Sequence, residues 1–352
     1  MTKKLHLEFM RIIAIILVIF NHTGERGFLL YTVTQESIFY WIYFFFSITC
    51  KIAVPLFWMI SGCLLIEKEE SIGIIYKKRV LRMVLVLVFF SLIHYAIPMV
   101  KHPEMRIFDV GYFFDRLLCS DGFAPAYWYL YAYIGVLLML PVIQKAAKSM
   151  NAKEYVYLFT LALAFQGIIP ISQYFLGKGK VNINGHLGEY IFPQNVIFFI
   201  AGYYFENIIE KKNLTGKIAI KLFLSGIAAI VISCFSTKYM ADMTGQYSET
   251  FYNNLIFVPT VAMFYLIRFL FEKYADKISD KTAKLIVALG GASFGIMLME
   301  DVLRVKTQFV FEFLKSYCGS FLSCIIWVFT AWGCGVIGIT LMKKISFMKK
   351  MI

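Results

Sequence analysis

Long apolar stretches recur along the whole chain and are separated by short polar connections. A helix needs about 20 apolar residues to cross a bilayer. Ten stretches approach that length, and their approximate cores are residues 8–25, 39–66, 80–99, 126–145, 154–173, 190–209, 218–237, 251–271, 285–304 and 319–342. The pattern therefore predicts an all-α fold, a polytopic membrane helix bundle of about ten transmembrane helices. The second stretch is unusually long, so we expect it to be tilted or to kink at Pro55.

Composition agrees with this fold, and charge orients it. The 352 residues are 60% hydrophobic and only 16% charged, which excludes an ordinary soluble domain. With the N-terminus inside, 22 of the 35 basic residues fall in inner connections and ten fall outside. Cytoplasmic connections are the Lys/Arg-rich ones, so both termini are predicted to be cytoplasmic, in a multi-pass protein of the cell membrane. Lysines beside membrane lipids also explain the net charge of +13 without a nucleic-acid partner.

The chain shows no internal boundary between domains. We expect one transmembrane domain over residues 1–345 and a short basic cytoplasmic tail over 346–352. The largest outer connection contains an amphipathic piece, Phe108 to Cys119, which is predicted to form an interfacial or re-entrant helix. The cysteines show no spacing typical of a metal site, so no metal is expected. The sequence leaves a homo-oligomer open.

The first apolar stretch carries two ionisable residues, Arg11 and His22. Eleven helical steps separate them by about 16 Å along the axis, and they point to nearly the same face, about 20° apart. Ionisable groups inside a membrane segment are costly and usually functional. The alternative is that Arg11 anchors the helix by snorkelling to the cytoplasmic interface and that His22 lies in the outer interface.

Two further sets of polar residues have a functional and a structural interpretation. Arg79 and Arg82, at the foot of the third stretch, share a helix face and can hold phosphates, or they can simply anchor the helix at the inner interface. Lys51 falls near mid-membrane, where a cation needs a partner or water. Trp128 opens the fourth stretch and can stack on a sugar, although the aromatic belt at the outer interface explains it as well.

The ninth stretch ends in two adjacent carboxylates, Glu300 and Asp301. Glu300 is four residues before Arg304, so the two can pair on one helix face. A carboxylate here could orient or tune the imidazole of His22, provided that the first and ninth helices are neighbours. His94, in the third stretch, is a second candidate for the same cavity, and a core histidine with satisfied hydrogen bonds is its alternative.

The chain resembles the acyltransferase-3 family of integral membrane acyltransferases, of the surface-polysaccharide O-acetyltransferase type. Four motifs in order carry the resemblance: Arg11-x10-His22, the stretch Val54-Pro-Leu-Phe-Trp-Met-Ile-Ser-Gly62, Arg79-x-x-Arg82, and the stretch Ser293-Phe-Gly-Ile-Met-Leu-Met-Glu300. The last motif often ends in His in the family, and here that position holds Glu300. A role assigned to that His therefore does not transfer unchanged.

The resemblance implies acyl transfer across the membrane without a metal. The donor would be an acyl-CoA, most often acetyl-CoA, as co-substrate from the cytoplasm. The acceptor would be a hydroxyl of a cell-envelope glycan or of a lipid-linked oligosaccharide. Arg79 and Arg82 would meet the CoA phosphates, and Arg11 the pyrophosphate or the pantetheine arm. His22 would act as general base or accept the acyl group itself, with Glu300 beside it, and Lys51, Trp128 and Asp301 are the residues we assign to the acceptor.

Two other classes of protein share parts of this pattern. A transporter of a small molecule or glycan intermediate would use Lys51, Glu300 and Arg11 as a substrate or proton path. A membrane scaffold gives no reason for the spacing of Arg11 and His22. The absence of an internal repeat argues against the transporter. Acetyl, succinyl and other short acyl groups remain open, as do general-base catalysis and an acyl-histidine.

Overall fold

The computed structural model describes residues 4–101, 108–118, 122–177, 193–247 and 254–352. Helices make up this part of the chain, and it contains no β-strand. The α-helices are α1 (Leu5–Asn21), α2 (Leu30–Val33), α3 (Tyr40–Cys50), α4 (Ala53–Leu65), α5 (Ile72–Ile74), α6 (Leu81–Lys101), α7 (Val110–Leu118), α8 (Trp128–Ser149), α9 (Ala152–Leu163), α10 (Ile169–Gly177), α12 (Gln194–Tyr203), α13 (Gly216–Thr244), α14 (Phe257–Lys273), α15 (Asp280–Met342) and α16 (Ser346–Met351). Short π-helical pieces extend or join some of them: Ile75–Val80, Ala164–Ile168 and Tyr204–Ile208.

The predicted all-α membrane bundle is confirmed at this level. Within the described ranges, six helical segments are long and apolar enough to cross a membrane: Tyr40–Leu65, Ile72–Met99, Pro125–Ser149, Ala152–Ser172, Gly216–Thr244 and Asp280–Met342. The first, sixth and eighth predicted stretches form the shorter helices α1, α12 and α14. The number of ten spans and the cytoplasmic termini stay predictions.

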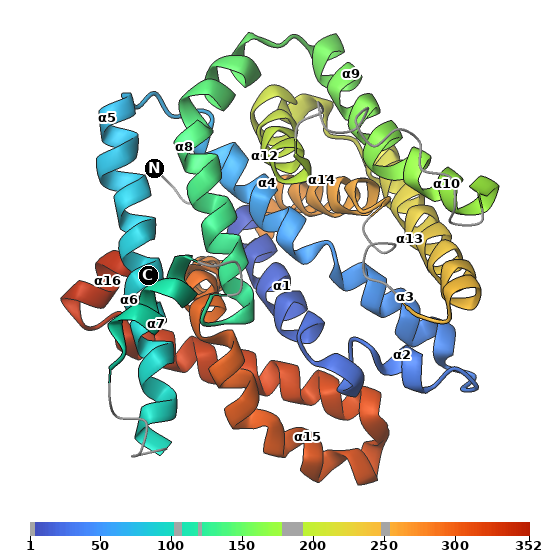
Figure 1. Cartoon of the computed structure of the whole chain (residues 1–352). Helices are drawn as coiled ribbons and strands as arrows, with labels where there is room; N and C mark the ends of the chain where they lie inside the picture. Colours follow the sequence, from blue (N-terminus) through green and yellow to red (C-terminus); the bar gives the residue numbers. More distant parts are fainter. Residues whose placement is uncertain (1–3, 102–107, 119–121, 178–192, 248–253) are drawn as a thin grey trace.

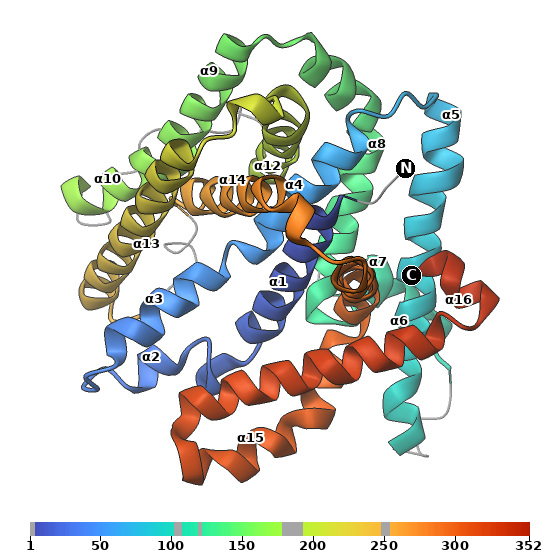
Figure 2. The same ribbon diagram turned by 180° about the vertical axis from the view of Figure 1, so that it is seen from behind.

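Helix α1 lies at the centre of the molecule in both ribbon views (Figures 1 and 2). It packs against α15, α4, α14 and α3. The side chains of Met10, Ala14 and Val18 recur every fourth residue and are buried along one face, the spacing of a helix stripe that faces a core. The one helix that carries both Arg11 and His22 is therefore surrounded by the helices that must complete any site around them.

The second predicted stretch is broken one turn before the expected kink. α3 ends at Cys50 and α4 begins at Ala53, so the break falls at Lys51 and Ile52 rather than at Pro55. Proline has no N–H, so Pro55 cannot donate to the carbonyl of Lys51 four residues earlier. The helix restarts with Pro55 in its first turn, where a missing N–H costs little.

Two glycines let α4 and α12 cross at backbone distance. A Cβ on Gly62 would lie 1.7 Å from the carbonyl oxygen of Phe199, and a Cβ on Gly202 would lie 1.9 Å from that of Met59. Neither position can accept a side chain without moving a helix. Close packing therefore accounts for Gly62 in the Ser61-Gly62 pair.

α15 contains the last two predicted stretches in two limbs. Gly319 has a φ of 74° and a ψ of 166°, which is non-helical and favours glycine, and the chain reverses there. The indole N–H of Trp327 on the second limb donates to the carbonyl of Arg304 on the first at 3.1 Å. Figures 1 and 2 show the two limbs side by side beneath α1.

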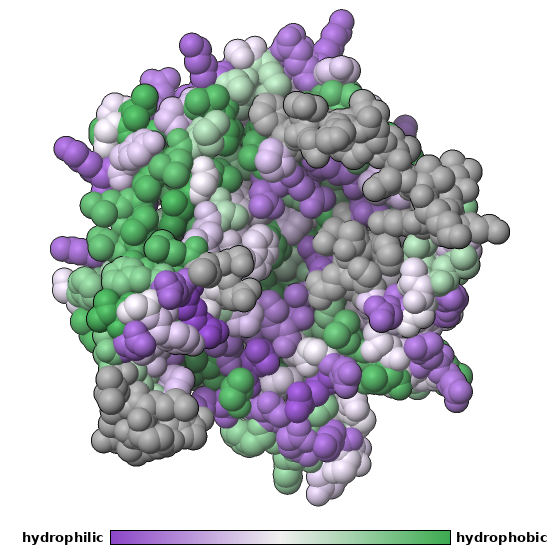
Figure 3. Space-filling view, in the orientation of Figure 1, coloured by the Kyte–Doolittle hydropathy of each residue, from purple (hydrophilic) through white to green (hydrophobic). Residues whose placement is uncertain are grey.

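Two short helices complete the fold. The amphipathic piece predicted at residues 108–119 forms α7 over Val110–Leu118, and Cys119 lies outside the described residues. The expected tail over 346–352 forms α16, which buries Met348 and Met351 and packs on α6. Figure 3 shows a hydrophobic surface over α6 and α8, with hydrophilic side chains gathered toward the middle of the same face.

Candidate active site

His22 is held by the turn that follows α1. The helix ends at Asn21, and the N–H of His22 still donates to the carbonyl of Ile19 at 3.2 Å. The hydroxyl of Thr23 donates to the carbonyl of Phe20 at 2.7 Å and accepts from the N–H of Phe28 at 2.9 Å. This closed turn fixes the backbone at His22. The direction of the imidazole is then set by the side chains around it.

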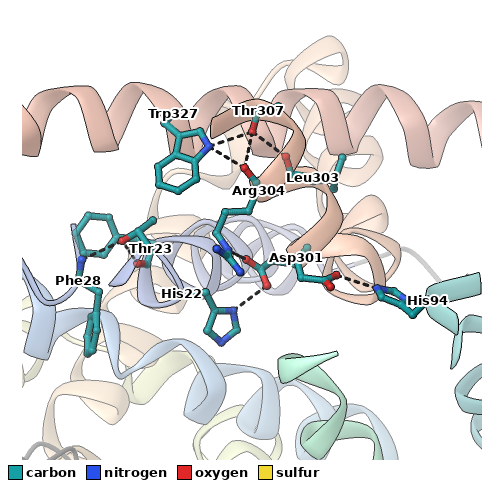
Figure 4. Close-up of polar contacts among 11 residues, drawn as sticks. His22, Thr23, Phe28, His94, Asp301, Leu303, Arg304, Thr307 and Trp327 are labelled. Atoms are coloured by element: carbon teal, nitrogen blue, oxygen red, sulfur yellow. Dashed lines mark hydrogen bonds and ion pairs between the residues drawn. The ribbon is translucent and has the colours of Figure 1, made fainter. Parts of the chain in front are cut away.

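A carboxylate from α15 sets the imidazole. Nδ1 of His22 lies 2.8 Å from Oε2 of Glu300, and Nε of Arg304 donates to Oε1 of the same carboxylate at 2.9 Å. In Figure 4 the side chains of His22 and Arg304 point toward one another. Glu300 is 1% exposed. In a neutral imidazole whose Nδ1 donates to this carboxylate, the lone pair is on Nε2. Glu300 thus contacts both residues that the sequence predicted beside it, His22 and Arg304.

Asp301 belongs to a different histidine. Adjacent helix residues point about 100° apart, and Asp301 turns away from His22 to accept from Nε2 of His94 at 2.8 Å (Figure 4). Nδ1 of His94 lies 2.9 Å from both the carbonyl of Phe90 and the hydroxyl of Tyr127. Both ring nitrogens of His94 are thus engaged. His94 is not in the lining of the cavity onto which His22 opens, and the interpretation that the sequence favoured, a core histidine with satisfied hydrogen bonds, agrees with these contacts.

His22 opens onto a cavity of about 450 Å³, which we call the histidine cavity. Lys51 and Trp128 line it, as predicted for residues that meet one substrate with His22, and Asp301 is not in its lining. The ammonium of Lys51 lies 4.5 Å from the ring centre of Phe28. The polar side chains that sequence reasoning missed here are Asn21, Gln194 and Asn195.

Arg11 opens onto a second cavity of about 270 Å³, which we call the arginine cavity. Its polar and charged lining comes from four helices and consists of Arg11, Ser61, Arg82, Tyr129 and Tyr133. Ile352, which follows α16, also lines it. The guanidinium of Arg82 donates to the carbonyl of Met351 at 3.1 Å. The tail thus closes one wall of a cavity that holds two of the predicted arginines.

Arg79, the third predicted arginine, is not in the lining of the arginine cavity. It is in the π-helical piece Ile75–Val80, whereas Arg82 is in α6. A π-turn changes the angle per residue, so the two positions do not have the regular α-helical spacing that the sequence predicted. Nε and Nη2 of Arg79 donate to the two oxygens of Glu70 at 2.5 and 2.7 Å. These bonds lower the pKa of the Glu70 carboxyl below its usual value.

Both cavities share part of their walls. Phe57, Tyr129 and Met297 line the histidine cavity and also the arginine cavity. Arg11 lines only the second and His22 only the first. The common face that the sequence predicted for Arg11 and His22 therefore serves two adjoining cavities rather than one.

The links between α1 and α15 fall on the motif residues. The hydroxyl of Ser293 donates to the carbonyl of Arg11 at 3.2 Å, and the carboxylate of Glu300 binds His22 at the other end of α1. Ser293 and Glu300 begin and end the late motif of the sequence, and Arg11 and His22 begin and end the first. The first residue of the late motif therefore contacts the first residue of the first motif, and the last contacts the last.

Comparison with known proteins agrees with this arrangement. A family model described as an acyltransferase domain matches residues 5–342. No curated protein and no solved structure matches the chain. Since the match covers nearly the whole chain and includes every residue of the two cavities except Ile352, the chain belongs to the acyltransferase-3 family of membrane acyltransferases.

Proposed function

We propose that this protein is an O-acyltransferase of the cell membrane. It takes an acyl group, acetyl in the first instance, from acyl-CoA on the cytoplasmic side. It delivers that group to a hydroxyl of a cell-envelope polysaccharide or its lipid-linked precursor. The observation that carries the proposal is the buried pair of His22 and Glu300, which leaves one imidazole nitrogen at a cavity beside the cavity of Arg11 and Arg82.

The chemistry follows from the orientation of His22. Nε2 takes the proton of the acceptor hydroxyl while its oxygen attacks the thioester carbonyl carbon, so a C–O bond forms. The tetrahedral intermediate then collapses and its C–S bond breaks. The imidazolium gives its proton to the departing CoA thiolate, which leaves as the free thiol. The carboxylate of Glu300 on Nδ1 would stabilise the imidazolium in the interval, as the orienting carboxylate of a catalytic triad does.

The arginine cavity suits the donor. Arg82 and Arg11 are permanently charged, and guanidinium groups bind phosphate oxygens in pairs. Arg11 already shares a hydrogen bond of 2.7 Å with Glu8, which orients its side chain. With the nucleotide at these arginines, the pantetheine arm would run past Ser61 toward the shared wall of Phe57, Tyr129 and Met297.

The histidine cavity suits a sugar. Trp128 supplies an aromatic face, and Asn21, Gln194 and Asn195 supply amides that pair with hydroxyl groups. The cavity is larger than the arginine cavity, and a few polar groups on an otherwise apolar wall are typical of small-ligand sites. Lys51 lines it as well and would favour an acceptor with an acidic group.

The test is release of free CoA by the purified protein in lipid nanodiscs. Acetyl-CoA is supplied with an extract of the envelope glycan of the source cells. We expect glycan-dependent CoA release and an ester on the glycan, both detected by mass spectrometry. If acetyl, succinyl and butyryl donors all give no glycan-dependent release, the acyl-CoA assignment is wrong. Movement of glycan across vesicles without ester formation would favour the transporter alternative.

A further inference from the structure

The reacting groups of the proposed function lie on opposite sides of one wall. His22 is in the histidine cavity, the arginines that suit the donor are in the arginine cavity, and three side chains face both. The acyl carbon must reach the acceptor beside His22, so it must pass the wall formed by Phe57, Tyr129 and Met297. We call these three side chains the partition.

Tyr129 is the member of the partition that ring contacts hold in place. Its ring lies 6.3 Å from that of Phe57 and 4.8 Å from that of Trp58, and it stacks on Tyr133 at 5.9 Å. Trp58 is completely buried and Tyr129 is 8% exposed. Packed interiors resist displacement of such a ring. Phe57 is half-buried and contacts Tyr129, so the ring of Tyr129 is the fixed part of the partition.

The third member has the opposite character. Met297 reaches the partition from α15, about one helical turn before Glu300, and is 6% exposed. A methionine side chain is unbranched, has three rotatable bonds and adapts to its surroundings. Met297 can thus change rotamer without moving the packed ring of Tyr129, and it lies about one helical turn from the carboxylate that orients His22.

We propose that Met297 is the specificity-determining residue for the length of the acyl group. This inference rests on the proposed function. Phe57 and Tyr129 form the aromatic walls of the passage, and Met297 fills the remaining space and moves aside for a short acyl group. A longer chain would need the volume that the Met297 side chain occupies. The native protein should therefore transfer acetyl and discriminate against butyryl and hexanoyl.

The experiment compares donors of different length in one protein. CoA release is measured in nanodiscs with acetyl-, butyryl- and hexanoyl-CoA and the same glycan extract, for the native protein, Met297→Ala and Met297→Leu. A pocket that excludes one extra methylene discriminates by about 10-fold or more. We expect Met297→Ala to raise the butyryl-to-acetyl ratio of kcat/KM by at least about 10-fold. Met297→Leu conserves volume and should leave the ratio near the native value.

Two methionines serve as matched controls. Met83 lines only the arginine cavity, so Met83→Ala should leave the length ratio unchanged. Met299, two residues after Met297 on α15, lines neither cavity, so Met299→Ala should leave the ratio and acetyl transfer unchanged. Met297→Val is a smaller truncation, to be used if Met297→Ala does not elute as a single folded species.

The outcomes distinguish a failure of the role of Met297 from a failure of the proposed function. Acetyl transfer with an unchanged length ratio in both Met297→Ala and Met297→Val overturns the role of Met297 and leaves the proposed function standing. An equal rise in the ratio for Met83→Ala also overturns it, because the passage would then lie elsewhere. Absence of transfer from every donor by the native protein overturns the proposed function and this inference with it.

Discussion

The histidine cavity and the arginine cavity place their charged groups by different means. His22 is oriented by Glu300, which is 278 residues away in the chain. Arg11 is held by Glu8, three residues away, and Arg82 of the same cavity donates to the backbone carbonyl of Met351 in the tail. The histidine therefore depends on a carboxylate that the docking of α15 against α1 supplies, whereas Arg11 depends on local structure and Arg82 on the packing of α16 against α6.

This difference bears on how each cavity would work. The proton acceptor is complete before any ligand arrives, because Glu300 is buried and already bonded to both His22 and Arg304. Arg82 donates to a backbone carbonyl, that of Met351, at 3.1 Å, and a phosphate can replace that acceptor. Changes at the histidine cavity should thus lower kcat, and changes at the arginine cavity should raise KM for acyl-CoA.

The largest effect is expected for His22→Ala. Loss of a general base costs about 10²- to 10⁴-fold in rate, and we expect kcat for CoA release to fall by that amount while acyl-CoA binding persists. The measurement is steady-state CoA release together with binding of acetyl-CoA by isothermal calorimetry.

His94→Ala is the matched control for His22→Ala. His94 also pairs with a carboxylate of α15, but both of its ring nitrogens are engaged and it faces a separate cavity. We expect His94→Ala to reduce thermal stability and to keep most of the activity of the protein that remains folded. Equal loss of kcat in the two variants would contradict the assignment of His22.

The second effect concerns the carboxylate. Glu300→Gln keeps the shape of the side chain but removes the charge that stabilises the imidazolium, so kcat should fall by about 10²-fold, the low end of the general-base range. KM for acyl-CoA should change little. Asp301→Asn, one residue on, should leave kcat near native, and a larger loss in Asp301→Asn than in Glu300→Gln would reverse the two roles.

The third effect separates the two arginines of one motif. Hydrogen bonds to charged groups contribute about 1.5–3 kcal/mol, so Arg82→Ala should raise KM for acyl-CoA by about 10-fold or more. Arg79→Ala should raise it less, because Arg79 is already bonded to Glu70 and lies outside the lining of the arginine cavity. Competition by CoA lacking its 3′-phosphate would show which phosphate each arginine meets.

The smallest effect is expected for Glu70→Gln. Removing this partner frees Arg79 for phosphate, and because partly exposed ion pairs contribute about 0–1 kcal/mol, KM should fall by at most about 5-fold. The pKa of Glu70 is lowered by Arg79, so the pair persists near neutral pH. Its stabilisation is lost only as the pH falls through that lowered value. A rise in KM for Glu70→Gln would show that the pair itself holds the site together.

The helices and the pair of Glu300 and Arg304 could be predicted from the sequence because both follow from local rules. Apolar length marks membrane helices, and the spacing of Glu300 and Arg304 puts them on one face. The pair of His22 and Glu300 also requires that α1 lies beside α15, which residue spacing does not encode, and the bonds of Ser293 and Glu300 show that it does.

Other features depend on geometry that residue spacing does not encode. The π-helical piece Ile75–Val80 contains Arg79 but not Arg82, and the break at Lys51 falls before Pro55 because the restarted helix tolerates proline in its first turn. The partition joins residues from three helices far apart in the chain. Asn21, adjacent to His22, was the one missed cavity residue with a local signal, since it is a further polar side chain beside an ionisable one at the end of an apolar helix.

The most direct measurement is a structure of the protein in nanodiscs with a non-hydrolysable thioether analogue of acetyl-CoA. The account predicts phosphates at Arg82 and Arg11 in the arginine cavity, with the acyl end against Met297 and Phe57 and facing Nε2 of His22. Density for the nucleotide in the histidine cavity, or an acyl end that does not approach the partition, would contradict the assignment of the two cavities to donor and acceptor.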